Sequence, residues 1–352
     1  MKVRRSTIAS LAVVGTALVA AFAPFRADWI EWLFSNGVYP LVQPRLTRLS
    51  NRVPFALFDV LLVGTTILIV VWLALACLRL RTNGWRFMSR SATMAAALYL
   101  IFLGVWGFNY RREPLRRHIE FHQQRVTHDG LRQLATQAVT ELNVIYPKLP
   151  STWPAWRELP PQMSDAFDAA RAALGPRWRV ELGYPKKSLL DAYFKRTAID
   201  GMVAPFFLEV LVNQDVLPFE RPFTVTHEWG HLAGRADESE ASFLGWLTCM
   251  HGPVWARYSA WISLYGTIVT GLPSDERRAV GAMLNPGPRQ DLVALSERIA
   301  RQSTPFARRA SSAAYDRFLK ANRLREGMAS YGLVVTLLLG TAIEVPPVGG
   351  TR

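Results

Sequence analysis

The stretch Thr224-Val-Thr-His227-Glu228-Trp-Gly-His231-Leu232 decides how the second half of this 352-residue chain is interpreted. Residues four apart share one face of an α-helix, so His227 and His231 lie side by side if the stretch is helical. Two imidazoles on one face can bind one Zn²⁺, and Glu228 beside the first of them can reach a water molecule on the metal. Chance produces such a match in this chain on the order of 0.01 times. The motif therefore predicts a zincin site rather than two structural histidines.

A catalytic zinc site of this kind takes a third protein ligand and leaves one position for water. Three acids follow the motif closely enough to supply this ligand: Asp237, Glu238 and Glu240. Asp237 has the spacing His-Glu-x-x-His-x-x-Gly-x-x-Asp that a minority of metzincins use. Glu238 has the Glu-x-x-Ala form of gluzincins, which place a glutamate on a second helix packed against the motif helix.

Helical geometry favours Glu238 among the three acids. Small residues follow it at positions i+3, i+4 and i+7: Ala241, Ser242 and Gly245. Such a stripe lets another helix approach closely. Asp237 and Glu240 have a second explanation, because Asp-x-x-Glu is the capping-box signature of a helix start. We expect His227, His231 and Glu238 to bind the metal, with Glu240 and Asp237 as alternative third ligands.

The first 110 residues have the composition of a membrane anchor. They hold 11 of the 41 Lys and Arg residues but only 3 of the 27 Asp and Glu residues. Three apolar segments of roughly 17 to 25 residues, the length of a membrane-spanning helix, lie at about residues 8–25, 60–78 and 91–108. We expect three transmembrane helices in residues 1–110 and one domain in residues 111–352. The first segment also resembles a cleaved signal peptide, but Pro24 would then begin the mature chain, which signal peptidases reject.

The orientation of this anchor is only weakly determined by its charges. Basic residues flank the segments almost equally on both sides, so the positive-inside rule does not decide. The first helix often dominates and follows the basic start Met-Lys-Val-Arg-Arg, which favours a cytoplasmic N-terminus. Three crossings then place residues 111–352 outside the cytoplasm. Residues 29–54 are aromatic and interrupted by proline, which favours an amphipathic stretch in the membrane interface over a structured domain.

The rest of the chain is expected to be mainly helical. Residues 129–146 and 164–174 have apolar side chains at helical spacing, and residues 204–212 are β-branched and aromatic, as is typical of a strand. Residues 261–272 and 333–339 are apolar but short for spans, so we assign them to core helices. The predicted fold is mainly α: a three-helix transmembrane anchor followed by a zincin-like α+β metallopeptidase domain with a small sheet.

Further polar residues have open roles at this stage. Glu209 on the expected strand and Asn213 directly after it either line a substrate cleft or face solvent. His251 and Tyr331 are candidates for an oxyanion donor, which stays unassigned. Three histidines follow the last apolar segment, and their irregular spacing favours interface residues over metal ligands: His118, His122 and His128.

The stretch from His227 to Cys249 resembles the centre of a family of bacterial multi-pass membrane proteins of unknown function with a zincin-type, gluzincin-like domain. The similarity extends along most of the chain and includes residues 35–40, 54–55, 106–110, 201–213, 315–322 and 330–332. The family pattern has acids at the positions of Glu238 and Glu240 but not of Asp237, which argues against the metzincin option. The resemblance implies a zinc peptidase in the bacterial inner membrane and no narrower activity.

Together these features predict a membrane-anchored, zinc-dependent metallopeptidase that hydrolyses peptide bonds with Glu228 as general base. The alternative is a catalytically inactive zinc-binding scaffold that binds membrane or envelope proteins, with zinc serving stability. The expected partners are membrane lipid and a peptide or protein substrate. The net charge of +14 also suggests nucleic acid, but the arginines flank apolar runs and no nucleic-acid-binding signature appears, so none is expected.

Overall fold

The structure is a computed structural model that describes residues 5–175, 178–324 and 332–343, and these are mainly helical. The N-terminal elements are α1 (Arg5–Phe22), α2 (Ala27–Trp29), the π-helix η1 (Ile30–Val38), α3 (Tyr39–Asn51) and α4 (Leu57–Val105). The body contains α5 (His128–Ile145), α6 (Leu159–Ala173), α7 (Asp191–Thr197), α8 (Arg221–Leu232), α9 (Glu238–His251), α10 (Val254–Thr270), α11 (Ser274–Ala282), α12 (Pro286–Gln302), α13 (Pro305–Ala321) and α14 (Leu333–Gly340). Its strands are β1 (Gly201–Ala204) and β2 (Glu209–Val212).

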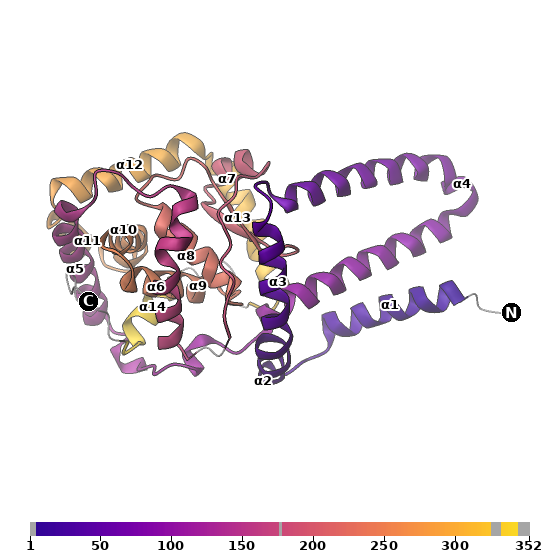
Figure 1. The fold of residues 1–352 in the computed structure, drawn as a ribbon, viewed down its shortest axis with the longest axis horizontal. Helices are drawn as coiled ribbons and strands as arrows, with labels where there is room; N and C mark the ends of the chain where they lie inside the picture. Colours follow the sequence, from indigo (N-terminus) through magenta and orange to yellow (C-terminus); the bar gives the residue numbers. More distant parts are fainter. Residues whose placement is uncertain (1–4, 176–177, 325–331, 344–352) are drawn as a thin grey trace.

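Two helical stretches of α4 are long and apolar enough to cross a membrane, Leu57–Cys77 and Gly84–Val105. The helix runs out from the body and folds back towards it as a hairpin (Figure 1). Only 6% of each stretch is buried, so apolar side chains such as Leu68 face outward. Such a hairpin finds a favourable solvent in lipid rather than in water. The predicted segments 60–78 and 91–108 lie largely within these two candidate spans.

The first predicted segment, residues 8–25, is mostly helical as α1, which packs along α4. Its N-terminal end points to the same side as the turn of the α4 hairpin, away from the body (Figure 1). The helical stretches Thr7–Phe22 and Ala27–Asn51 meet at an angle of 116°. The two stretches are long and apolar enough for a membrane span only when they are taken together. The described residues therefore contain two helices that could cross a membrane, or three with this bent pair.

The segment from α2 to α3 packs against the body along one face, so the expectation of a purely interfacial stretch is incomplete. Tyr39 Oη donates to the carbonyl of Leu232 at 3.0 Å, and Thr47 Oγ1 donates to the carbonyl of Leu208 at 2.7 Å. On the other face Trp32 is 76% exposed. Buried hydrogen bonds to the body fix the segment there, while its exposed aromatic side suits a membrane interface.

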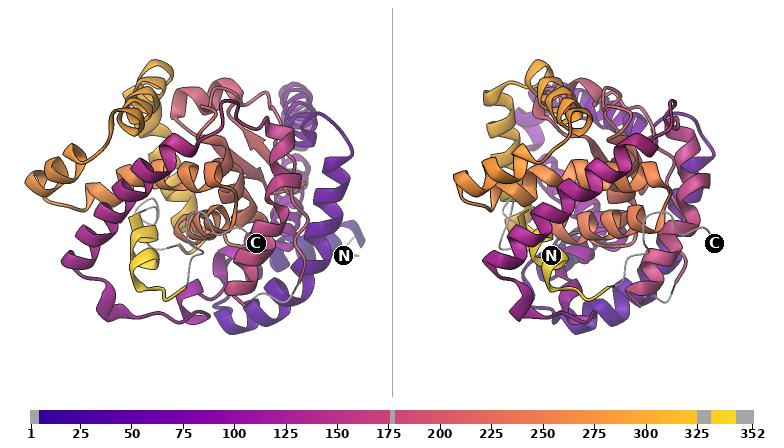
Figure 2. Two further views of the ribbon diagram at one scale, coloured as in Figure 1. Left: turned by 60° about the vertical axis from the view of Figure 1, so that its left-hand side comes forward. Right: turned by 90° about the vertical axis from the view of Figure 1, so that its left-hand side faces the viewer.

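Helix α9 lies at the centre of the body. Every residue from Glu238 to Met250 is buried, and α6, α8, α10 and α14 all contact the helix. The two views in Figure 2 show α11 and α12, drawn in orange, on the outer rim. A helix without a solvent-facing side is unusual outside a core. The acids and hydroxyls of α9 must therefore find their partners inside the protein.

Four predicted core helices are present, and the predicted strand is different. Residues 129–146, 164–174, 261–272 and 333–339 fall mainly in α5, α6, α10 and α14. The single strand expected over residues 204–212 is wrong, because the chain turns between β1 and β2, which pair antiparallel with Ala204 opposite Glu209. Pro205 begins this turn, and Leu208 ends it with a φ of 49° and an N–H bond to the carbonyl of Ala204.

Candidate metal centre

Helix α8 presents the two histidines of the motif as neighbours. Pro222 lies in its first turn, where the missing N–H of proline leaves no intrahelical bond unmade. The rings of His227 and His231 follow one turn apart, with centroids 4.8 Å from each other. After α8 the chain reverses at Gly234, whose φ of 79° is a left-handed conformation that glycine adopts without strain. This turn brings α9 back alongside α8.

The two helices approach so closely that side chains larger than hydrogen are excluded at two positions. A Cβ on Gly230 would lie 2.8 Å from Cα of Ala241, and a Cβ on Gly245 would lie 2.9 Å from the backbone nitrogen of His227. Ala241 and Gly245 belong to the stripe of small residues predicted on the face of Glu238. The stripe faces α8, which places the first turn of α9 next to both imidazoles.

Three ligand-type atoms converge at this contact. Glu238 Oε2 lies 3.2 Å from His227 Nε2 and 3.4 Å from His231 Nε2, and the three side chains are the one group of this kind found among the described residues. Ligands about 2.0–2.1 Å from a tetrahedral Zn²⁺ lie about 3.3–3.4 Å from one another. The donor set and its spacing thus fit a zinc ion, with a fourth position left over.

The other ring nitrogen of each histidine is held by the protein. Nδ1 of His231 lies 2.7 Å from the backbone carbonyl of Arg235, which can only accept a hydrogen bond. In the neutral ring this fixes the proton on Nδ1 and leaves the Nε2 lone pair facing the cluster. Nδ1 of His227 lies 3.1 Å from Ser242 Oγ. Both rings are therefore oriented as metal ligands usually are, by a partner behind them.

Glu238 is oriented by a residue that sequence reasoning did not single out as part of the site. Tyr315 in α13 donates its hydroxyl to Glu238 Oε1 at 2.5 Å, so Oε2 is the atom left to face the histidines. Tyr315 lies 77 residues further along the chain. No spacing rule connects residues so far apart, and the family resemblance of residues 315–322 did not indicate a contact with Glu238. The role of Ser242 was equally hidden within the small-residue stripe.

The electrostatics of the cluster favour a positive charge at its centre. Burial opposes ionisation of Glu238, but the two imidazoles outweigh burial and hold the pKa of this carboxyl well below its usual range. Burial likewise favours a neutral His231 ring, yet the carboxylates of Glu238 and Glu228 raise its pKa to about 9. A buried group of carboxylates and imidazoles that attracts a proton this strongly also suits a divalent cation.

Glu228, the predicted general base, lies beside the cluster with one oxygen uncommitted. The residue is 2% exposed, and within the described parts of the chain its buried Oε2 has no hydrogen-bond partner. Gly201, the first residue of β1, leaves room for it, since a Cβ there would lie 2.6 Å from Glu228 Oε1. Burial raises the pKa of Glu228. These properties suit a group that takes up and releases a proton.

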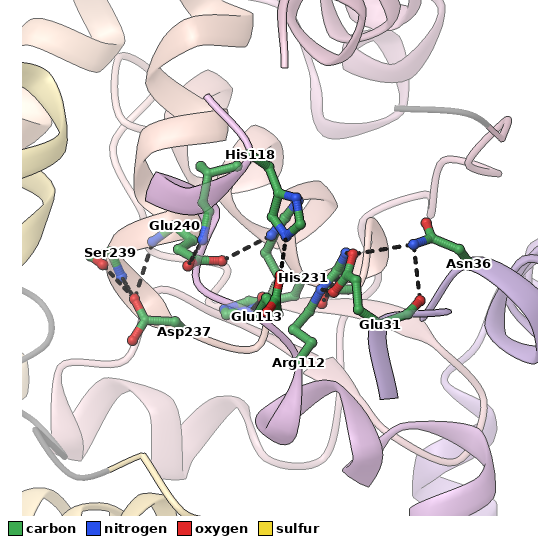
Figure 3. Close-up of polar contacts among 12 residues, drawn as sticks. Glu31, Asn36, Arg112, Glu113, His118, His231, Asp237, Ser239 and Glu240 are labelled. Carbon is green, nitrogen blue, oxygen red and sulfur yellow. Dashed lines mark hydrogen bonds and ion pairs between the residues drawn. The ribbon is translucent and has the colours of Figure 1, made fainter. Parts of the chain in front are cut away.

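The alternative ligands Asp237 and Glu240 bind other partners than the two histidines (Figure 3). Asp237 caps α9 as predicted, with its carboxylate accepting from the N–H groups of Ser239 at 2.9 Å and Glu240 at 3.2 Å. Glu240 does not complete a capping box, and that expectation is wrong. Its carboxylate accepts from the Leu115 N–H at 2.5 Å and pairs with Arg235 at 3.3 Å. The buried Arg235 guanidinium attracts Glu240 more strongly than a helix N–H does.

The turn between α8 and α9 is also held from the N-terminal segment. Arg112 donates to the carbonyl of Gly234 at 2.9 Å and forms a two-pronged ion pair with Glu31 in η1 at 2.6 and 2.9 Å (Figure 3). A bidentate, largely buried arginine pair has fixed geometry. Glu31, which precedes α4 in the sequence, and Arg112, which follows it, thus help to set the position of the candidate metal ligands.

Glu209 and Asn213 neither line a cleft nor face solvent, so both interpretations of them are wrong. Each is at most 1% exposed. Glu209 pairs with the buried Lys186 at 3.1 Å and accepts from the N–H groups of Leu57 at 3.1 Å and Phe58 at 2.6 Å. These N–H groups belong to the first turn of α4, whose own N-cap residue has no capping side chain. A distant strand therefore caps the candidate span.

The remaining histidines stay outside the cluster. His251 ends α9, about 20 Å along the helix from Glu238, which makes it unsuitable as an oxyanion donor. Three others pair with glutamates at or near the surface, as expected for residues that are not ligands: His118 with Glu113, His122 with Glu120 and His128 with Glu276. Tyr331, the second oxyanion candidate, lies outside the described residues.

Comparison with known proteins assigns the chain to a family. The model described as "Protein of unknown function (DUF3810)" matches residues 34–339. The chain belongs to this family. The DUF3810 match includes α4, the motif helix and Tyr315, so the candidate spans and the cluster lie within one family unit. No curated protein and no solved structure matches the chain.

Proposed function

We propose that this DUF3810 protein is a membrane-anchored zinc metallopeptidase. The observation that carries the proposal is the convergence of three ligand atoms: His227 Nε2 and His231 Nε2 lie 3.2 and 3.4 Å from Glu238 Oε2. The buried carboxylate of Glu228 lies beside them. Two histidines, one carboxylate and one open position form the ligand set of a catalytic zinc site rather than of a structural one. The His227-Glu228-x-x-His231 order supports the same class.

The residues of the site divide the chemistry among them. Zn²⁺ bound there would supply a nucleophilic water near neutral pH and polarise the scissile carbonyl. Oε2 of Glu228 accepts a proton from the attacking water and later delivers this proton to the leaving amine. Ser242, Tyr315 and the Arg235 carbonyl keep the ligands in position. Among the described residues β1 pairs with β2 on one edge only, and its first residue, Gly201, lies next to Glu228. The other edge of β1 suits pairing with an extended peptide.

Metal content is the first test of the proposal. We expect about one zinc per purified full-length chain, measured by elemental analysis after dialysis, because three protein ligands form a complete catalytic set. The His227→Ala, His231→Ala double variant should contain none, while His118→Ala, a surface control, should keep the metal. Stoichiometric zinc in the double variant would refute the assignment of the ligands.

Activity is tested separately with Glu228→Gln, which keeps the ligands but removes the base. Membranes containing the wild type should accumulate new peptide termini that membranes containing Glu228→Gln lack, and the rate should fall by about 10²–10⁴-fold. Quantitative mass spectrometry of labelled termini measures the difference. A variant that binds zinc and produces the same termini would contradict the role of Glu228. A wild type that binds zinc and produces none would favour the inactive scaffold instead.

We also propose that the body lies outside the cytoplasm of a bacterial cell. The N-terminal end of α1 and the turn of α4 point away from the body to one side, as an odd number of crossings requires (Figure 1). With the N-terminus inside, alkaline phosphatase fused after Arg352 should be active, and a fusion at Asn83 should be silent. The reverse pattern would place the body in the cytoplasm.

A further inference from the structure

The candidate metal cluster touches the point at which α4 ends. The ring of His231 packs edge-on against the indole of Trp106, with centroids 6.2 Å apart and an interplanar angle of 78°. Trp106 is the residue directly after the candidate span Gly84–Val105 and the C-cap of α4. Trp106 is 5% exposed and packs inside the body, so its place directly after the span, and not contact with lipid, sets its height relative to the membrane. One of the three ligands therefore lies against a residue at the level of the membrane surface.

A second chain of contacts joins the cluster to the same span. Tyr315, which donates to Glu238, stacks on Phe318 one turn later in α13, with centroids 6.0 Å apart. Phe318 in turn packs against Phe102, inside the candidate span, at 6.4 Å. Helix α13 thus contacts a metal ligand and the apolar span within one turn. The cluster is fixed to the membrane-facing end of the body by two separate elements.

The end of α1 marks the same level. Arg111, close after the end of α4, donates to the carbonyl of Ala20 at 2.6 Å, and Arg323, shortly after α13, donates to the carbonyls of Ala21 at 3.0 Å and Ala23 at 2.8 Å. Cations at the C-terminal carbonyls of a helix are favourable, and arginines at the end of a span lie in the headgroup layer. The segments that follow α4 and α13 therefore both contact the C-terminal end of α1, where this helix would leave the hydrocarbon core of the membrane.

The cluster is also enclosed. The exposed fractions of the side chains of His227, His231 and Glu238 are 14%, 11% and 3%. Atoms this deeply placed exclude a folded protein surface as substrate and favour a single extended segment. Because the ring of His231 contacts Trp106, the residue directly after the span, a few residues of extended chain at about 3.3 Å each are enough to reach the cluster from the end of a span.

We infer that the substrate is a membrane protein and that the scissile bond lies in the extended segment immediately outside the bilayer, within about ten residues of the end of a transmembrane helix. This inference rests on the proposed peptidase function and narrows its substrate class. A substrate anchored in the same bilayer presents that segment at the height of the cluster. Soluble proteins and loops far from the membrane do not.

The test maps the positions of Glu228-dependent cleavage. Full-length wild type and Glu228→Gln are expressed in a bacterial host, and new termini are identified by mass spectrometry in both the membrane and the soluble fraction. We expect the termini that depend on Glu228 to concentrate within about ten residues of span ends. Termini spread over soluble proteins or distant loops would overturn the inference and leave the peptidase standing. The absence of any Glu228-dependent terminus would instead overturn the proposed function, and the inference with it.

A spacer experiment then tests distance directly in one substrate identified in this way. A flexible insertion of about 20 Gly and Ser residues between the span and the cut site should reduce cleavage about tenfold, because a longer flexible linker lowers the effective concentration of the cut site at the cluster. The same insertion on the far side of the cut site is the matched control and should leave cleavage unchanged. Equal cleavage of the two altered substrates would overturn the inference.

Discussion

The α4 hairpin and the α8–α9 pair depart from the usual distribution of polarity in opposite directions. In α4 the apolar side chains face outward and only 6% of each candidate span is buried. In α9 the charged side chains of Glu238 and Glu240 are buried at the centre of the body. The exposed apolar surface of α4 needs a partner from outside the chain, whereas the acids of α9 have partners within it: Arg235 for Glu240, and the two imidazoles and Tyr315 for Glu238. Lipid suits the outer surface of the hairpin, and the Zn²⁺ that we propose suits the Glu238 cluster.

The glycines of the two regions differ in how closely other atoms approach them. In α4 a Cβ on Gly64 would meet nothing within 4 Å, whereas on Gly230 in α8 it would meet the backbone of Ala241 at 2.8 Å. Gly64 in α4 therefore has no packing partner among the described residues. Glycine in α8 sets the distance between two helices, and that distance brings Glu238 to the histidines.

The largest expected effect in this comparison is the loss of zinc on changing the buried acid. Glu238→Gln should weaken zinc binding by more than about 100-fold, the upper range for residues that only support a ligand. Glu240→Gln is the matched control on the same turn and should keep the metal, since its carboxylate binds Leu115 and Arg235. Zinc titration against a competing chelator measures both. Normal affinity in Glu238→Gln with loss in Glu240→Gln or Asp237→Ala would identify a different ligand.

Glu240→Gln nevertheless has a consequence of its own. The neutral glutamine side chain no longer compensates the charge of the buried Arg235. Burial and the nearby Arg112 already lower the pKa of Arg235 to about 10. Breaking such a buried pair costs about 3–5 kcal/mol. The variant should therefore separate stability from metal binding: a lower unfolding temperature with zinc affinity retained in the folded protein.

A smaller effect is expected from alanine at the two contrasting glycines. Gly230→Ala should reduce the free energy of unfolding by about 1–3 kcal/mol, because its methyl group meets backbone atoms that cannot move aside. Gly64→Ala adds the same methyl group in α4 and should leave stability unchanged or slightly higher. Thermal unfolding of the full chain in one detergent compares them. Equal losses would show that Gly64 has a packing partner in the membrane and that the two regions are less different than proposed.

How far the sequence predicts each region follows from the range of the interactions involved. The candidate spans and the motif helix depend on neighbours within a few residues, so hydropathy and the spacing of His227 and His231 were sufficient to find them. The small-residue stripe predicted the contact of α9 with α8, because one helical face is also a local property. Glu209 was misplaced since its partners, Lys186 and the first turn of α4, are 23 and about 150 residues away.

The roles of Tyr315 and Arg112 were out of reach for the same reason. Each completes a buried polar group on an element distant in sequence, Glu238 in one case and the carbonyl of Gly234 in the other. Such pairs form only after the helices have packed, and nothing in the spacing of single residues encodes them.

The smallest expected effect concerns how the helices of the two regions begin. α9 is capped by its own Asp237, whereas α4 depends on the distant Glu209. Asp237→Ala should cost only a local cap, about 0.5–2 kcal/mol of stability, and leave zinc in place. Asp237→Asn should restore most of that loss because asparagine caps as well as aspartate does. Unfolding and zinc content, measured on both variants in parallel, decide between a cap and a ligand. Metal loss in both variants, despite the cap that asparagine provides, would make Asp237 a ligand and place the site among the metzincins.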